Sequence, residues 1–106
     1  MYILSCEKPE KGGGIYRCET DGNGLKINAY LPCDRPMYAV KASGRLHVLL
    51  RAPFANGENS GYFSCSEDLS DKTDVRDTLG RVACHLCVIG EDVYIANYIS
   101  GNVVKN

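Results

Sequence analysis

Long apolar runs and an excess of either charge are both missing from this 106-residue sequence. No apolar stretch approaches the roughly 20 residues that a membrane-spanning helix needs, and the longest, Leu46–Leu50 and Val93–Ala96, are the size of strands. Twelve Lys and Arg face thirteen Asp and Glu, so the positive surface of a nucleic-acid-binding protein is not expected. No basic region precedes the apolar residues of the N-terminus, as it would in a secretory signal. The sequence therefore favours a cytoplasmic protein, one domain in size, without a nucleic-acid or membrane partner.

A second pair of zinc ligands is also missing, although the sequence contains six cysteines. Cys84 and Cys87 form a lone CxxC in a strand-like run, where positions three apart point to opposite faces. Neither a tetrahedral zinc site nor a redox motif at a helix N-terminus fits that setting. A reducing cytosol also keeps thiols free. We therefore expect no metal and no cofactor, with most cysteines acting as small apolar side chains.

What the sequence does contain is an internal repeat. Residues 14–21 align with residues 61–68 at an offset of 47, and both begin with Gly, two large apolar residues, a spacer and Cys. The same offset aligns residues 44–49 with 91–96, and an offset of 48 aligns 36–40 with 84–88. No stretch of useful length shows the helical period. The chain is therefore expected to build its fold from repeated units of strands.

Each unit divides into four short strands separated by Gly, Asn, Asp and Pro turn signals. The strands expected are Ile15–Glu19, Lys26–Leu31, Met37–Lys41 and Leu46–Arg51, then Tyr62–Ser66, Asp74–Leu79, His85–Ile89 and Val93–Asn97. The segment before Leu79 is polar enough to form a loop or a helical turn instead. Four strands in a repeat of about 40–50 residues are typical of a β-propeller blade.

The predicted fold is accordingly all-β, a partial propeller of antiparallel four-stranded blades. Residues 1–6 would form a closing strand, 14–52 blade one, 61–98 blade two, and 101–106 the start of a third blade.

The second unit carries a more specific pattern in Cys84–Leu86, Ala96–Tyr98 and Ser100–Val103. In their order and spacing these motifs resemble the lactonase family of seven-bladed propellers, of the 6-phosphogluconolactonase type. Gly14–Tyr16 and Arg35–Tyr38 agree with the same family, while its common Ser-Pro-Asp-Gly turns are absent. The resemblance implies an N-terminal fragment of about two blades, whose open strand edges favour self-association.

The resemblance further implies hydrolysis of a small anionic sugar lactone, most directly 6-phosphogluconolactone to 6-phosphogluconate, in carbohydrate metabolism. That reaction needs a base for water, donors for the oxyanion and cations for the phosphate. His85 is the candidate catalytic base, since imidazole titrates near neutral pH, and a histidine packed silently between blades is the alternative. Arg35 and Asn97 are candidates for substrate binding, although Asn97 could instead bond the backbone of the next blade. Arg81 stands at a similar point to Arg35 and is expected to be a solvated loop residue.

Two other functions stay open. One is a related lactonising propeller that acts on muconate-type diacids. The other is a propeller used as a binding scaffold without catalysis, because one fold hosts many functions. The feature that separates enzyme from scaffold is His85 lying in one pocket with a cationic neighbour.

Overall fold

The computed structural model describes residues 1–106 and confirms the all-β prediction. Its ten strands are β1 (Tyr2–Ser5), β2 (Gly14–Asp21), β3 (Gly24–Pro32), β4 (Pro36–Ala42), β5 (Arg45–Leu50), β6 (Asn59–Ser66), β7 (Arg76–Arg81), β8 (Ala83–Ile89), β9 (Asp92–Asn97) and β10 (Asn102–Lys105). Every expected strand is present, including the weakest one, which begins at Arg76. The one helical segment is a 3₁₀ turn at Pro9–Lys11, and no helix is long and apolar enough to cross a bilayer.

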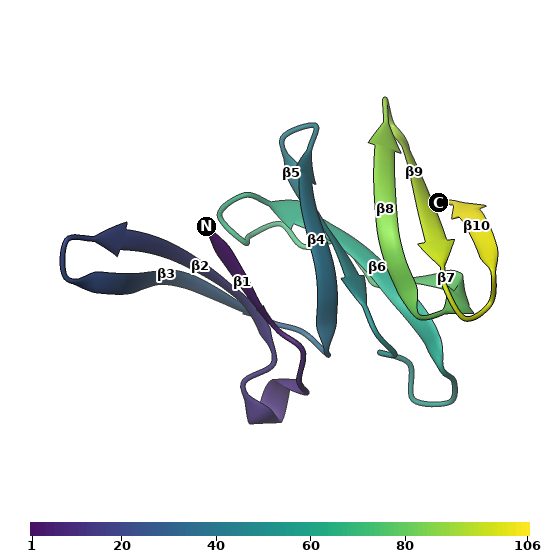
Figure 1. Ribbon diagram of the computed structural model, residues 1–106, viewed down its shortest axis with the longest axis horizontal. Helices are drawn as coiled ribbons and strands as arrows, with labels where there is room; N and C mark the ends of the chain where they lie inside the picture. Colours follow the sequence, from purple (N-terminus) through teal and green to yellow (C-terminus); the bar gives the residue numbers. More distant parts are fainter.

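The strands form three antiparallel sheets that stand side by side in chain order (Figure 1). The N-terminal sheet contains β1, β2 and β3, the middle sheet contains β4 to β7, and the C-terminal sheet contains β8, β9 and β10. Within each sheet, consecutive strands pair with one another, as expected of a chain whose strands are joined by short turns.

The sheets divide the chain at different points from the two expected units. Residues 14–52 give two strands to the N-terminal sheet and two to the middle sheet, and residues 61–98 are divided in the same way. The chain passes from one sheet to the next at Arg35 and again at Val82, which lie 47 residues apart and both have left-handed backbone, with φ of 45° and 53°. A sequence period gives the length of a unit without giving its starting point. Hydrogen-bond pairing sets that starting point, two strands later than the sequence pattern indicates.

Two hydrophobic cores lie on the two sides of the middle sheet. Alternation along β5 turns Leu46, Val48 and Leu50 towards the N-terminal sheet and Leu49 towards the C-terminal sheet. The buried members of the first core are Ile15, Cys33, Leu46, Val48, Leu50, Phe63, Cys65 and Leu69. Those of the second are Leu49, Tyr62, Ala83, Leu86, Val93 and Ile95. The middle sheet is therefore covered on both faces, whereas each outer sheet is covered on one.

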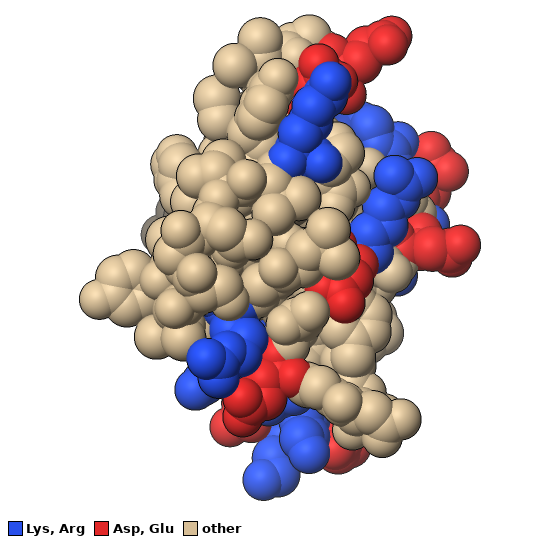
Figure 2. All heavy atoms as spheres, turned by 90° about the vertical axis from the view of Figure 1, so that its right-hand side faces the viewer, with Lys and Arg blue, Asp and Glu red and all other residues tan.

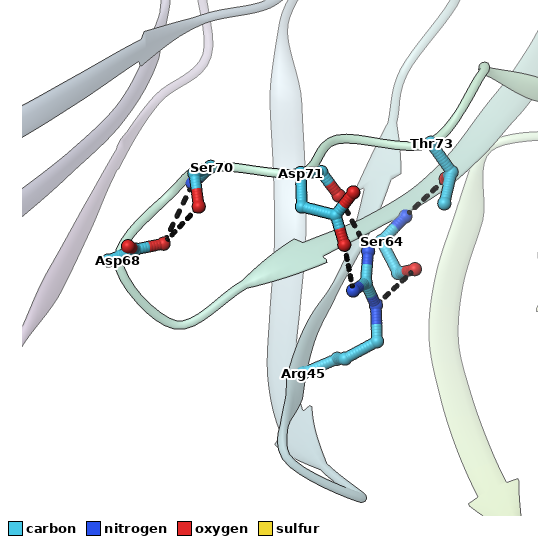
Figure 3. Close-up of polar contacts among 6 residues, drawn as sticks. All are labelled: Arg45, Ser64, Asp68, Ser70, Asp71 and Thr73. Carbon is cyan, nitrogen blue, oxygen red and sulfur yellow. Dashed lines mark hydrogen bonds and ion pairs between the residues drawn. The ribbon is translucent and has the colours of Figure 1, made fainter.

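Polar contacts fasten the long β6–β7 loop, residues 67–75, to the middle sheet (Figure 3). The Arg45 guanidinium donates to Ser64 Oγ at 3.0 Å, to Asp71 Oδ2 at 3.0 Å and to the Asp71 carbonyl at 2.7 Å. Ser64 N–H donates to Thr73 Oγ1 at 3.0 Å, and Thr73 N–H donates to the Ser64 carbonyl at 2.9 Å. These contacts hold the loop against the middle sheet, and β7 begins after it at Arg76.

Candidate functional site

A cavity of about 620 Å³ opens where the connections β3–β4, β5–β6, β7–β8 and β9–β10 meet at one end of the sheets. Three arginines line it, namely Arg35, Arg51 and Arg81. The remaining lining residues are Ala52, Phe54, Gly57, Glu58, Val82 and Ile99. Three guanidinium groups against one carboxylate make the lining of this arginine cavity positively charged.

The internal repeat positions the cavity's backbone. The Arg51 N–H donates to the carbonyl of Arg35 at 3.0 Å, and 47 residues later the Tyr98 N–H donates to the carbonyl of Val82 at 2.8 Å. Each bond ties the end of a sheet's second strand to the residue before its first strand. Val82 is β-branched and left-handed, a conformation that costs an L-residue about 1–2 kcal/mol. Strain of this kind persists only where the surrounding bonds hold it, and it often marks a functional site.

Arg35, the sequence's candidate for substrate binding, lies at the cavity wall. Its Nε donates to Asp34 and its Nη2 donates to the Ala52 carbonyl at 2.6 Å. These contacts fix the guanidinium in one orientation while leaving donors unused, because the group carries five N–H bonds. Arg35 is thus ordered by contacts within the chain.

Arg51 and Arg81 complete the cationic wall in different ways. The Arg51 side chain makes no hydrogen bond or ion pair within the chain. Arg81 pairs through Nη1 with Glu58 Oε2 at 3.1 Å, and the Glu58 side chain is 78% exposed. An ion pair so open to water contributes little and is readily exchanged for a better anion. The cavity therefore offers one free guanidinium and a second that is only weakly occupied.

Arg81, which the sequence places among solvated loop residues, is the last residue of β7 and lines the cavity with a side chain that is 49% exposed. Its backbone is held in place, because its N–H donates to Ser100 Oγ at 2.8 Å and its carbonyl accepts from the Ile99 N–H at 3.2 Å. Both contacts come from the β9–β10 turn, which is distant in the sequence. Arg81 is consequently fixed at the cavity rim.

His85 does not line the arginine cavity. It lies on β8 with an exposed side chain, and its ring centroid is 5.1 Å from that of Tyr38 on β4, with the planes tilted by 54°. The bulge between Ala83 and His85 in the β8–β9 pairing sets its direction. The candidate base and the candidate phosphate ligands are therefore not brought into one pocket.

Asn97 is buried and does not line the cavity either. Its Oδ1 accepts from the Thr78 hydroxyl at 2.9 Å and its Nδ2 donates to the Thr78 carbonyl at 3.0 Å. A Cβ at Gly80 would come within 2.5 Å of the Asn97 side chain. Asn97 thus joins β9 to β7 and lies between two sheets, bonding the backbone of the preceding sheet where the sequence suggested that of the next blade.

Arg51 is the residue of the cavity that the sequence alone does not single out. It stands at the end of an expected strand, and nothing local separates it from an ordinary surface arginine. The available signal was the repeat, because Arg51 follows Arg35 within one unit as Tyr98 follows Val82 within the next.

The cysteines form two groups by burial. Cys18, Cys33 and Cys65 are buried, and Cys6, Cys84 and Cys87 are exposed. Burial raises the pKa of the Cys33 thiol to about 12 and also raises the pKa of Cys65.

Comparison of the chain with protein-family models, with curated proteins and with solved structures finds no match.

Proposed function

We propose that the arginine cavity binds the anionic group of a phosphorylated sugar acid or its lactone, as the ligand site of a lactonase-type propeller. The observation that carries this proposal is the partner-free Arg51 guanidinium, beside Arg35 and the weakly occupied Arg81. Guanidinium groups form bidentate, charge-assisted hydrogen bonds with phosphate and carboxylate, which suits this ligand class. The reaction proposed for the full protein is hydrolysis of 6-phosphogluconolactone to 6-phosphogluconate.

The propeller itself is part of the proposal. It is supported by three antiparallel meander sheets packed side by side in chain order and by a 47-residue repeat that spans them. On this proposal β4 to β7 form one complete blade, and the two outer sheets are parts of its neighbours. The cavity then lies on the face of the ring where the connections between blades meet.

A second candidate function is a binding scaffold without catalysis. The observation that favours it is the position of His85 outside the cavity, because a base must lie within hydrogen-bond reach of the water that it activates. Both candidates share the same anion site. They differ in whether a bound lactone is turned over.

The binding proposal is tested by titrating the chain with 6-phosphogluconate, the stable product, by calorimetry. We expect Arg51→Gln to weaken binding by about tenfold or more, since hydrogen bonds to charged groups are worth about 1.5–3 kcal/mol. Arg51→Lys keeps the charge but loses the two-pronged geometry, so it should restore binding only in part.

Arg76→Gln is the matched control, because it removes an equal charge from a residue at the opposite end of β7 that does not line the cavity. Inorganic phosphate serves as a second ligand and separates recognition of the phosphate from recognition of the sugar. Equal binding by the chain and by its Arg51→Gln variant would contradict the proposal.

A further inference from the structure

Each contact between two sheets in this molecule joins two different kinds of face. We call the face that a sheet turns towards the following sheet its forward face, and the face towards the preceding sheet its backward face. The forward face of the N-terminal sheet, with Ile15, packs on the backward face of the middle sheet, with Val48 and Phe63. The forward face of the middle sheet, with Leu49, packs on the backward face of the C-terminal sheet, with Ile95. Two consecutive interfaces thus follow the same rule.

No other sheet packs against the backward face of the N-terminal sheet, and only the β1–β2 connection touches it, where Gly12 and Gly13 accept hydrogen bonds from the Tyr16 and Tyr30 hydroxyls. Ile3, Tyr16 and Tyr30 lie across from one another on its three strands, on the side opposite Ile15. The rings of Tyr16 and Tyr30 stack at a centroid distance of 4.6 Å, so the aromatic surface is continuous from β2 to β3. The N-terminal sheet and the residue before it expose several large apolar side chains, namely Met1, Ile3, Leu25, Ile27 and Tyr30.

The repeat identifies this open face with a face that is buried elsewhere in the chain. Ile3 pairs with Tyr16 as Val48 pairs with Phe63, and Tyr16 and Phe63 are 47 residues apart. Val48 is fully buried under the N-terminal sheet, whereas Ile3 is 41% exposed. The backward face of the N-terminal sheet is therefore the equivalent of a surface that another sheet covers.

The forward face of the C-terminal sheet is open in the same way. Ala96 pairs with Val103 as Leu49 pairs with Tyr62, on the side opposite Ile95. Tyr62 is 8% exposed because the C-terminal sheet covers it, while Val103 is 71% exposed. By the same alternation Lys105 and Asp92 also lie on this side, where they pair with each other at 3.5 Å. Figure 2 looks onto this side of the molecule and shows a broad uncharged area at the left and centre, with charged side chains at the top, along the right and at the bottom.

We propose that these two open faces bind one another between copies of this chain, so that the chain associates head to tail. The occupant is a second copy because the chain itself displays both halves of the interface that it repeats twice internally. Such a contact is heterologous: it uses different surfaces on the two partners and continues until a ring closes. The interface joins faces rather than strand edges, and it does not depend on the function of the arginine cavity. It is proposed for the chain of 106 residues, because in a longer propeller further blades would cover the same two faces.

The test uses two variants that each damage one face, Ile3→Lys on the backward face and Val103→Lys on the forward face. A buried unpaired charge prevents an apolar interface from closing. We expect the unmodified chain to have a mass above that of the monomer by light scattering after size exclusion, and each variant alone to be a monomer. Mixed in equal amounts, the variants should form a dimer, because each keeps the face that the other needs.

Leu79→Lys is the control, since Leu79 is exposed on β7 outside both faces and its replacement should leave the assembly unchanged. Circular dichroism confirms that each variant is folded, and a variant that unfolds is replaced by Ile3→Ser or Val103→Ser. A monomeric unmodified chain overturns the proposal. So does a Val103→Lys variant that still dimerises by itself, because this would mean that two backward faces pair with each other.

Discussion

Cys33 links the stability of the chain to alkaline pH. Burial raises the pKa of its thiol to about 12, and burial also raises the pKa values of Tyr62 and Cys65. Above the thiol's ordinary pKa of about 8.5, the unfolded chain loses a proton that the folded chain keeps. The folded state then binds more protons than the unfolded state, so stability is full below that pH and falls as the pH rises towards 12.

We therefore expect the free energy of unfolding, measured with urea, to decrease between pH 8 and pH 10. Cys33→Ala should reduce the slope by up to about 1.4 kcal/mol per pH unit, the contribution of one titrating group. Cys6→Ala, at an exposed cysteine, should leave the slope as it is. An unchanged slope in the Cys33 variant would show that the alkaline loss arises elsewhere.

Turnover of the lactone decides between the enzyme and the scaffold, and a His85 variant tests whether His85 is the base. If it acts as general base in the full protein, His85→Ala should lower the rate of lactone hydrolysis by about tenfold or more, in line with typical contributions of acid–base catalysis. Its exposed side chain makes a large loss of stability unexpected. The decisive measurement is turnover of 6-phosphogluconolactone alongside the unfolding midpoint. Unchanged turnover would remove His85 from the catalytic machinery.

At the scale of elements, the β6–β7 loop is held by one side chain more than by any strand pairing. Arg45 bonds the Asp71 carboxylate and carbonyl, and a tight turn in which Asp68 accepts from the Ser70 N–H at 3.0 Å begins the loop. Hydrogen bonds from the Ser70 hydroxyl and N–H lower the pKa of Asp68, so this turn keeps its charged form well into mild acid.

Arg45→Gln should release the loop while leaving the sheet in place. We expect faster hydrogen exchange and faster proteolysis within residues 67–75. The loss of stability should be about 1 kcal/mol, from the lost bonds to Ser64 Oγ and the Asp71 carbonyl, since the Asp71 carboxylate is 78% exposed and contributes little. Lys41→Gln is the control, because Lys41 contacts the same loop only through a solvent-exposed pair with Glu67 at 3.3 Å. Equal loop protection in the two variants would contradict the role given to Arg45.

Alternation and turn residues predicted individual strands well, since each strand depends on side chains a few positions apart. The grouping of strands into sheets could not be predicted in the same way. Pairing is decided at Arg35 and Val82, whose left-handed backbone is unusual for either residue type and leaves no mark in the sequence. The same reason hid the role of Arg51, because its place in the cavity depends on loops from three other parts of the chain.

At the scale of the whole molecule, the middle sheet belongs to both hydrophobic cores and should be the last part to open. β5 pairs on both sides, with β4 and with β6, and its side chains enter both cores. β10 pairs with one strand only, at the edge of the C-terminal sheet. We expect the slowest hydrogen exchange in β5 and the fastest strand exchange in β10. Exchange that is uniform across the three sheets would instead mean that they unfold as one unit.

The matching backbone at Arg35 and Val82 also bears on how a chain of this kind could lengthen. Both residues are left-handed, and both carbonyls accept an N–H from the end of the same sheet's second strand. A duplication of residues 36–82 would therefore join the copy to the original through a junction that the molecule already contains. The longer chain would gain one complete sheet, and the two outermost faces would stay as they are. Growth by whole units of 47 residues is thus open to this chain, whereas a duplication of another length would not bring matching backbone to the new junction.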